Sequence, residues 1–279
     1  MFASDGITAL PTVLSLGPLE VTGFGLAVLA GFVLAQIICI RELTRRGHLV
    51  EADAMPDVIM AALIGTLIGA KTYYVILVGD VSAFLSRGGF VFWGGFIGSV
   101  ILCTLVVRYK KLAFFRIADV AGIAIAGGYA VGRTGCWAVG DDYGRPWSGP
   151  FAVRFPEGAP PSTAQNLQQL FGVELPAGTD PLEVIAVHPT QLYEVAMGFV
   201  MFLVLWRFRA HTHKEGWLAG VYCVVAGLER FIVEFFRAKD DRFVAGLTVA
   251  QVIALIVAMI GVGIIVGRRR PGGAGSGRH

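Results

Sequence analysis

The sequence predicts an all-α membrane protein that crosses the bilayer several times. Hydrophobic residues make up 55% of the 279 residues and charged residues only 15%, and the mean hydropathy is +0.68. This composition excludes an ordinary soluble core. Apolar segments close to the about 20 residues that cross a bilayer as a helix recur along the chain. Seven transmembrane helices are therefore expected.

The seven helices are predicted from apolar runs that are separated by short charged or Gly/Pro-rich breaks. The fourth run is rich in glycine and carries Asp119 and Arg133. Glycines in GTLIGAKTYY and RGGFVFWGGFIGSV, in the second and third runs, have spacings that permit close helix contact. The expected spans are 19–40, 57–79, 90–107, 117–137, 189–206, 216–236 and 247–267.

Lysine and arginine indicate how these helices are oriented. Alternate loops, together with the C-terminal end, collect three, four, three and four basic residues, which are 14 of the 23 in the chain. By the positive-inside rule that side is cytoplasmic, so the N-terminus is expected outside and the C-terminus inside. The same clusters account for the net charge of +3 and indicate no nucleic-acid partner.

The segments outside the helices are predicted to be small. The stretch PSTAQNLQQLFG indicates one short helix between the fourth and fifth spans. The expected division is an outer amphipathic arm (1–18), transmembrane helices 1–4 (19–137), an extracytoplasmic head segment (138–188), transmembrane helices 5–7 (189–267) and a disordered cytoplasmic tail (268–279).

Charged residues inside the spans are the strongest indication of a functional site, because a charge in the membrane is costly. Arg230, Glu234 and Arg237 in ERFIVEFFR are spaced i, i+4 and i+7, which puts them on one stripe of the sixth helix. Arg133, in GRTGCWAVGDDYGRPW, belongs to another outward-running helix and is expected at similar depth. Converging guanidinium groups predict an anion site, and the expected anion is a lipid phosphate. The alternative is an ion pair that only fixes the helices to one another.

His188 and Cys136 each permit two interpretations. His188 begins HPTQLYE and is the one histidine expected on the outer side, where it is either a helix cap or an acid/base group. Cys136 lies beside Arg133, and is either an activated thiol or a small packing residue. The four cysteines show no metal spacing and no disulfide is argued. We expect neither a metal nor an organic cofactor.

Several motifs together resemble one known family. GRTGCWAVGDDYGRP, WSGPFAVRFP, HPTQLYE, ERFIVEFFR and GLTVAQ, in this order and at these distances, are similar to segments of the prolipoprotein diacylglyceryl transferase family of bacterial inner membranes. LGPLEVTGFGLAVLAGF and RGGFVFWGGFIG resemble its first and third helices. The resemblance covers nearly the whole chain.

The resemblance implies a transferase in the bacterial cytoplasmic membrane. The family moves the diacylglyceryl group of phosphatidylglycerol to the lipobox cysteine thiol of a preprolipoprotein at the outer leaflet and releases glycerol phosphate. A base must then help to form the thiolate, and cations must stabilise the departing phosphate. Membrane lipids and the lipobox peptide are the expected partners of a monomer. We assign catalysis to Arg133, Arg230, His188 and Asp141, and substrate binding to Arg133, Arg230, Gly144, Arg237, Glu234, Gln191 and Tyr193.

The chain departs from the family pattern at a few site positions. Cys136 and Val139 stand where the family usually has asparagines, and Asp141 where it has glutamate. Trp93 replaces a histidine of the third helix and Phe24 a tyrosine of the first. Two alternatives therefore stay open beside an active transferase. One is a divergent relative that binds anionic lipid but is silent or uses another acceptor, and the other is a lipid transporter.

Overall fold

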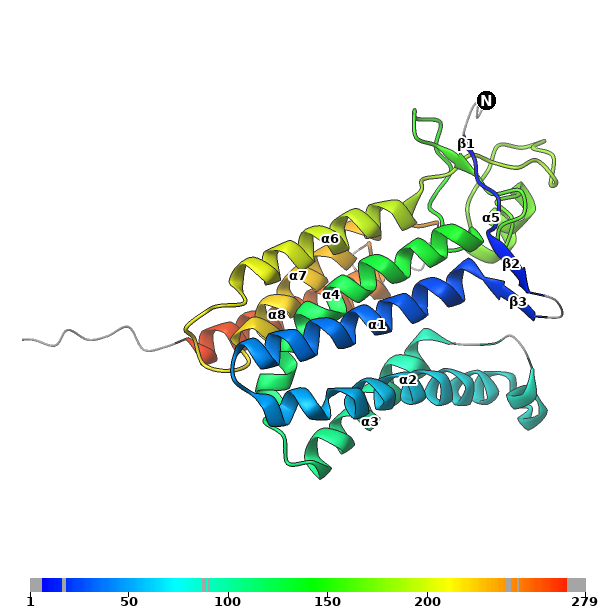
Figure 1. The fold of residues 1–279 in the computed structure, drawn as a ribbon. Coiled ribbons are helices and arrows are strands. Elements are labelled where there is room, and N and C mark those ends of the chain that lie inside the picture. Colours follow the sequence, from blue (N-terminus) through cyan, green and yellow to red (C-terminus); the bar gives the residue numbers. More distant parts are fainter. Residues whose placement is uncertain are drawn as a thin grey trace, which may run out of the picture. The chain divides into compact units, whose positions relative to one another are not determined.

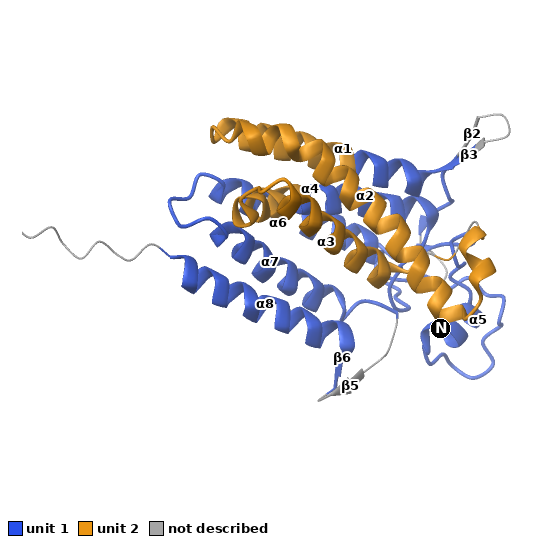
Figure 2. Cartoon of the chain, turned by 90° about the horizontal axis from the view of Figure 1, so that it is seen from below, with its two compact units in different colours: residues 1–31, 125–279 blue, residues 32–124 orange. Residues whose placement is uncertain are grey.

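The computed structural model describes residues 7–16, 19–86, 89, 91–238, 242–244 and 246–269, and its elements are labelled in Figure 1. The chain divides into two compact units, shown in Figure 2: residues 1–31 with 125–279, and residues 32–124. Helix α1 (Gly23–Arg45) begins in the first of these units and ends in the second, and α4 (Phe114–Val139) begins in the second and ends in the first. This all-helical, strongly apolar architecture is that of a polytopic membrane protein.

In the unit of residues 32–124, α2 (Leu49–Val78) and α3 (Phe92–Tyr109) are in close backbone contact, and the 3-10 helix η1 (Val81–Leu85) follows α2. A Cβ built on Gly69 would lie 2.2 Å from the carbonyl oxygen of Gly94, and one built on Gly65 would lie 2.5 Å from that of Gly98. Because these glycines have no side chain, the two backbones can approach closely. Small residues at the contact are typical of helix association in a membrane, where lipid tails provide no hydrophobic driving force. The close contact predicted from these glycines is confirmed.

In the other unit, α7 (Trp217–Val233) contacts both α6 (Thr190–Phe208) and α8 (Val249–Arg268). Strands β5 (Arg242–Val244) and β6 (Leu247–Thr248) form a short antiparallel pair before α8. Thr248 and Gln251 then cap that helix reciprocally, each side chain bonding to the other's backbone N–H. These contacts place the end of α7 and the start of α8 at the same end of the unit.

All seven predicted long helices are found in the described part of the chain. Six of them are long and apolar enough to cross a membrane, and α7, with 17 residues, is shorter than the expected span 216–236. The helix stops because the chain turns after Val233, where the N–H of Phe236 donates to the Val233 carbonyl at 2.9 Å. The α2 helix begins at Leu49 instead of residue 57. The number of crossings and the orientation of the termini stay predictions.

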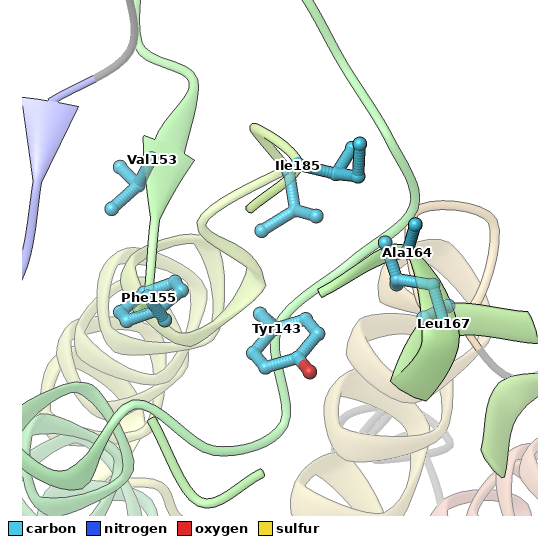
Figure 3. Packing of buried hydrophobic residues seen from close by; sticks show 8 residues of the cluster. Tyr143, Val153, Phe155, Ala164, Leu167 and Ile185 are labelled. Carbon is cyan, nitrogen blue, oxygen red and sulfur yellow. The ribbon is translucent and has the colours of Figure 1, made fainter. Parts of the chain in front are cut away.

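Between α4 and α6 the chain forms a small head that contains β4 (Val153–Arg154) and α5 (Ala164–Phe171). Its core stacks Tyr143 on Phe155, with ring centroids 5.6 Å apart, and Leu167 and Ile185 are buried beside them (Figure 3). The α5 helix confirms the short helix predicted in this segment. The head therefore has an apolar core of its own, from which its loops extend toward α4 and α6.

The N-terminal residues contribute short strands to this unit. Strand β1 (Ile7–Thr8) pairs in parallel with β4 of the head, and β2 (Val13–Leu16) pairs with β3 (Leu19–Thr22) as a hairpin that leads into α1. The expected arm 1–18 thus includes strand residues. Residues 1–6 and 17–18 of that arm, and residues 270–279 of the expected tail, lie outside the described residues.

Replacing Gly94 by alanine is expected to destabilise the protein, because the added Cβ would lie 2.3 Å from the Gly69 carbonyl oxygen. Overpacking of this kind costs about 1–3 kcal/mol, which should lower the thermal unfolding midpoint by several degrees in detergent micelles. Gly263→Ala in α8 is the matched control, since a Cβ there meets no atom within 4 Å. Equal midpoints for the two variants would contradict this account of the α2–α3 contact.

Candidate functional site

Arg133 on α4 is the first residue of a buried ion-pair cluster. Its guanidinium donates to the Asp142 carboxylate at 2.8 Å and to Glu194 on α6, and its side chain is only 14% exposed. A buried charge is tolerated when it is paired and hydrogen-bonded. Arg133 therefore connects the helix bundle to the first residues of the head.

Glu194 lies at the centre of this cluster and is 1% exposed. Its carboxylate contacts Arg133, lies 3.8 Å from the nearest nitrogens of Arg230 and Arg237, and is 3.2 Å from the Tyr129 hydroxyl. The predicted convergence of the three arginines is thus observed. Their site is already occupied by carboxylates of the chain, so an external anion has to compete with Glu194.

The end of α7 supplies the other two arginines. Arg230 pairs with Glu234 at 2.6 Å, one helical turn away, while Arg237, just beyond the helix, pairs with Asp142 at 2.7 Å. The Arg230 side chain is 35% exposed, against 14% for Arg133 and 17% for Arg237. Arg230 is consequently the guanidinium most accessible to a ligand.

Asp141 and Asp142 follow α4 in a turn, with Asp142 at a left-handed φ of 54°. Burial acts to raise the pKa of Asp142, but Arg237 and Arg133 outweigh it and hold that pKa well below its usual range. The stabilising effect of these ion pairs is therefore complete above the ordinary carboxyl pKa and is lost only in strong acid. Burial and the neighbouring Asp142 charge raise the pKa of Asp141 to about 6.

Gly144 is required where the head meets the end of α7. Its backbone bridges to Arg237 and its N–H donates to the His188 carbonyl at 2.8 Å. A Cβ on Gly144 would lie 2.3 Å from the Phe236 carbonyl oxygen. The backbone that Gly144 approaches thus belongs to the chain itself, and its predicted substrate contact stays a prediction.

Thr190 and Gln191, at the start of α6, fix the turn that carries the two aspartates. The Thr190 hydroxyl donates to the Asp142 carbonyl at 2.6 Å and the Gln191 amide donates to the Asp141 carbonyl at 2.5 Å. Both side chains are fully buried. The structure thus gives Gln191 a positioning contact, and its substrate contact stays a prediction.

His188 lies in an aromatic cluster at the border of head and helix. Its ring stacks on Trp147 with centroids 4.4 Å apart, and its Nδ1 lies 3.1 Å from the Tyr193 hydroxyl. Burial lowers the pKa of His188, so the imidazole is neutral at pH 7. A neutral ring can accept a proton, although here it lies outside the ion-pair cluster.

Three of the positions where the chain departs from the family pattern lie in different surroundings. Cys136 is buried, and its sulfur accepts from Arg133 at 3.3 Å. Phe24 on α1 is partly exposed, and its backbone lies beside Gly135. Trp93 belongs to the unit of residues 32–124, where it contacts Phe92 and Phe96 edge-on.

One group of side chains has the spacing of a metal site. Donor atoms of Cys136, Asp141 and Asp142 lie within 4.8 Å of one another. Two guanidinium groups are already bonded to Asp142, and their positive charges oppose a cation at this position. The arrangement is suited to anions.

Tyr129 and Glu229 are among the participants in the cluster that were not predicted. The Tyr129 hydroxyl lies 3.0 Å from Glu229 on α7 as well as 3.2 Å from Glu194. Glu229 immediately precedes Arg230 in the motif and is buried. An acid at this depth of an apolar helix was an available signal. Tyr129 lies one helical turn before Arg133 on α4, but a tyrosine at that spacing does not by itself indicate a site.

Comparison with known proteins identifies related chains. A family model described as prolipoprotein diacylglyceryl transferase matches residues 11–267. Among similar proteins are phosphatidylglycerol–prolipoprotein diacylglyceryl transferases of Xanthomonas oryzae pv. oryzae (31% identical; 93% of this chain, 91% of the relative), Bordetella parapertussis (30%; 94% and 96%) and Citrobacter koseri (30%; 92% and 92%).

Glu194→Gln is expected to lower the stability of the folded protein, since it removes the carboxylate at the centre of three arginines. Removing one partner of a buried ion pair costs about 3–5 kcal/mol, and thermal unfolding in detergent would register this as a lower midpoint. Glu157→Gln, at an exposed residue of the head, is the control. An unchanged midpoint for Glu194→Gln would show that Glu194 is not needed to stabilise the three arginines in the folded protein.

Proposed function

The chain belongs to the prolipoprotein diacylglyceryl transferase family, and we propose that it transfers the diacylglyceryl group of phosphatidylglycerol to the lipobox cysteine of a preprolipoprotein. The observation that carries this proposal is the convergence of Arg133, Arg230 and Arg237 around Glu194, with Arg230 partly exposed. Phosphatidylglycerol has one phosphodiester charge, which forked guanidinium donors recognise.

In this proposal the phosphate first engages Arg230 and then takes the place of Glu194 beside Arg133. Arg230 is the more exposed of the two, and its NH1 lies 3.8 Å from Glu194, beyond hydrogen-bond distance. Arg237 stays bonded to Asp142 and holds the head against the cluster. A ready-made set of donors is the kind of preorganised charge that stabilises a leaving anion.

The transfer itself is a substitution at carbon. The lipobox thiol loses its proton, the thiolate sulfur bonds to the terminal glyceryl carbon, and the bond from that carbon to the phosphate oxygen breaks. Glycerol phosphate leaves with the electron pair and takes up the proton that the thiol released. Arg133 and Arg230 would stabilise the charge that develops on this phosphate.

Asp141 is the base that the electrostatics favour. Burial and Asp142 raise its pKa to about 6, and a base works best when its pKa lies near the working pH. Asp142 is a weaker base, since two guanidinium groups lower its pKa. His188 is the second candidate, because its ring is neutral and lies near the start of α6.

We further propose that the chain works as a monomer in the bacterial cytoplasmic membrane, with its N-terminus and head outside. The clustering of basic residues in alternate loops supports this orientation. With that orientation the arginine cluster lies near the outer leaflet, where a lipobox peptide arrives after export.

Arg133→Ala and Arg230→Ala are each expected to abolish transfer, because each removes a phosphate contact worth about 2–4 kcal/mol in the transition state. The assay combines purified protein, phosphatidylglycerol in detergent and a lipobox peptide, with mass spectrometry for the diacylglyceryl thioether. Lysine at either position should not restore activity, since it lacks the fork.

Arg207→Ala, at an exposed position in the last turn of α6, should transfer normally. Near-normal turnover of Arg133→Ala or Arg230→Ala would refute the assigned roles. If wild-type protein binds the lipid and forms no thioether, the protein is better described as a relative that is catalytically silent or uses another acceptor.

The transfer rate is expected to rise with pH through about 6 and then level off, because the Asp141 carboxylate must be ionised to accept the thiol proton. Rates from pH 5 to 8 test this, with Asp141→Asn losing most activity across the range. If Asp141→Asn keeps the wild-type dependence of rate on pH and His188→Gln loses it, the base is His188 instead of Asp141.

A further inference from the structure

A small cavity lies beside the ion-pair cluster, between the head, the end of α7 and the start of α8. Its volume is about 250 Å³, below the range of about 300–1,000 Å³ that is typical of pockets for drug-sized ligands. The cavity is therefore suited to a small chemical group. The residues that line it are Arg145, Glu234, Phe235, Gly246, Thr248 and Gln251.

Glu234 connects this cavity to the arginine cluster. Its Oε2 lies 2.6 Å from NH2 of Arg230, and its side chain is 2% exposed. Among the described residues, this buried oxygen nevertheless accepts no hydrogen bond, because no donor is aligned with it. Buried acceptors without a partner are uncommon in folded proteins. Glu234 thus offers an acceptor to a group that occupies the cavity.

Gln251 and Thr248 offer donors in the same cavity. The Thr248 N–H donates to Oε1 of Gln251 at 3.0 Å, and the Gln251 N–H donates to Oγ1 of Thr248 at 3.2 Å. The cap therefore fixes the orientation of the Gln251 amide, since only its oxygen can accept. Its Nε2, with two N–H donors, and the hydroxyl hydrogen of Thr248 have no partner within the described ranges.

These lining groups complement a diol. Each hydroxyl of a diol both donates and accepts, so a diol can donate to Glu234 and accept from the Gln251 amide. A carboxylate in the cavity would be repelled by Glu234, and an ammonium group by Arg145. We propose that the cavity binds the terminal glycerol of the phosphatidylglycerol headgroup, so that Glu234 and Gln251 select this lipid by its two free hydroxyls.

This inference rests on the proposed function, since it takes the lipid phosphate to bind at Arg230. The headgroup glycerol is bonded directly to that phosphate, so neighbouring side chains have to bind the two groups. Arg230 and Glu234 meet this requirement, because they are in contact. After the transfer the same glycerol leaves as part of glycerol phosphate. Glu234 and Gln251 determine specificity in this scheme and do not contact the bond that breaks.

The test compares two lipids that differ in the hydroxyls alone. Short-chain phosphatidylglycerol and short-chain phosphatidyl-n-propanol have the same phosphodiester charge and a three-carbon headgroup. Calorimetric titration of the detergent-solubilised protein with each lipid gives the two Kd values. Wild-type protein is expected to bind phosphatidylglycerol about 10–100-fold more tightly, because the propyl group leaves the buried polar groups of the cavity without partners.

Two substitutions of Gln251 change the cavity in different ways. Gln251→Met keeps the length of the side chain and removes its donors, and should reduce the preference for phosphatidylglycerol over phosphatidylpropanol about fivefold or more. Gln251→Glu preserves the cap of α8, since glutamate serves equally at this position. Its added carboxylate favours an ammonium group, so relative affinity should shift toward short-chain phosphatidylethanolamine about fivefold or more.

The matched controls are Gln168→Met and Gln168→Glu, at an exposed position of α5 in the head. Both should keep the wild-type preference among the three lipids. Thermal unfolding midpoints in detergent show whether each variant is folded. If Gln251→Met does not fold, Gln251→Glu still tests the proposal, because it retains the contacts that begin α8.

The outcomes separate this inference from the proposed transfer. Equal affinity of wild-type protein for phosphatidylglycerol and phosphatidylpropanol would refute the headgroup site, and the anion site would stand if Arg230→Ala loses both lipids. A wild-type preference that both Gln251 variants retain would also refute it. Binding of free glycerol phosphate that depends on Gln251, without any lipid preference, would assign the cavity to the released product instead. If the preference depends on Gln251 but no thioether forms, the headgroup site stands and the transfer proposal fails.

Discussion

Burying several arginines in one place is possible only if carboxylates accompany them. Like charges in a medium of low dielectric repel strongly, and each unpaired ion would cost several kcal/mol. Here Glu194 meets this constraint, because it contacts Arg133 and lies near both Arg230 and Arg237. The attraction between Glu194 and the arginines therefore holds the site together. In the proposed function, the negative charge of the substrate takes the place of Glu194.

The head and the end of α7 are shaped by this cluster. Asp142 bonds to Arg133 of α4 and to Arg237, which follows α7, so the turn that carries it has to lie between α4 and the residues after α7. Gly144 permits the backbone of the head to reach Arg237, and Thr190 and Gln191 hold the carbonyls of the same turn. The chain leaves α7 at Val233, four residues before Arg237, whose side chain bonds to Asp142.

The same arrangement links structure to chemistry. Carboxylates of the chain pair with the arginines of the site, and in the proposed function a lipid phosphate replaces one of these negative charges by another. The partly exposed Arg230 offers the point of entry, while the more buried Arg133 is reached only by exchange with Glu194. The chain can thus keep paired arginines in its helices without binding every anion, since each exchange with a carboxylate has its own electrostatic cost.

The sequence by itself determined the fold class, the approximate helices and the motif arginines. Apolar runs of bilayer length and the spacing of Arg230, Glu234 and Arg237 are local patterns, and local patterns can be read along the chain. Tertiary structure decided the end of α7, the central place of Glu194 and the pairing of Tyr129 with Glu229. The reason is physical: these contacts join side chains from different helices, and residues as far apart in the chain as Tyr129 and Glu229, which are separated by 100 residues, meet only once the helices pack.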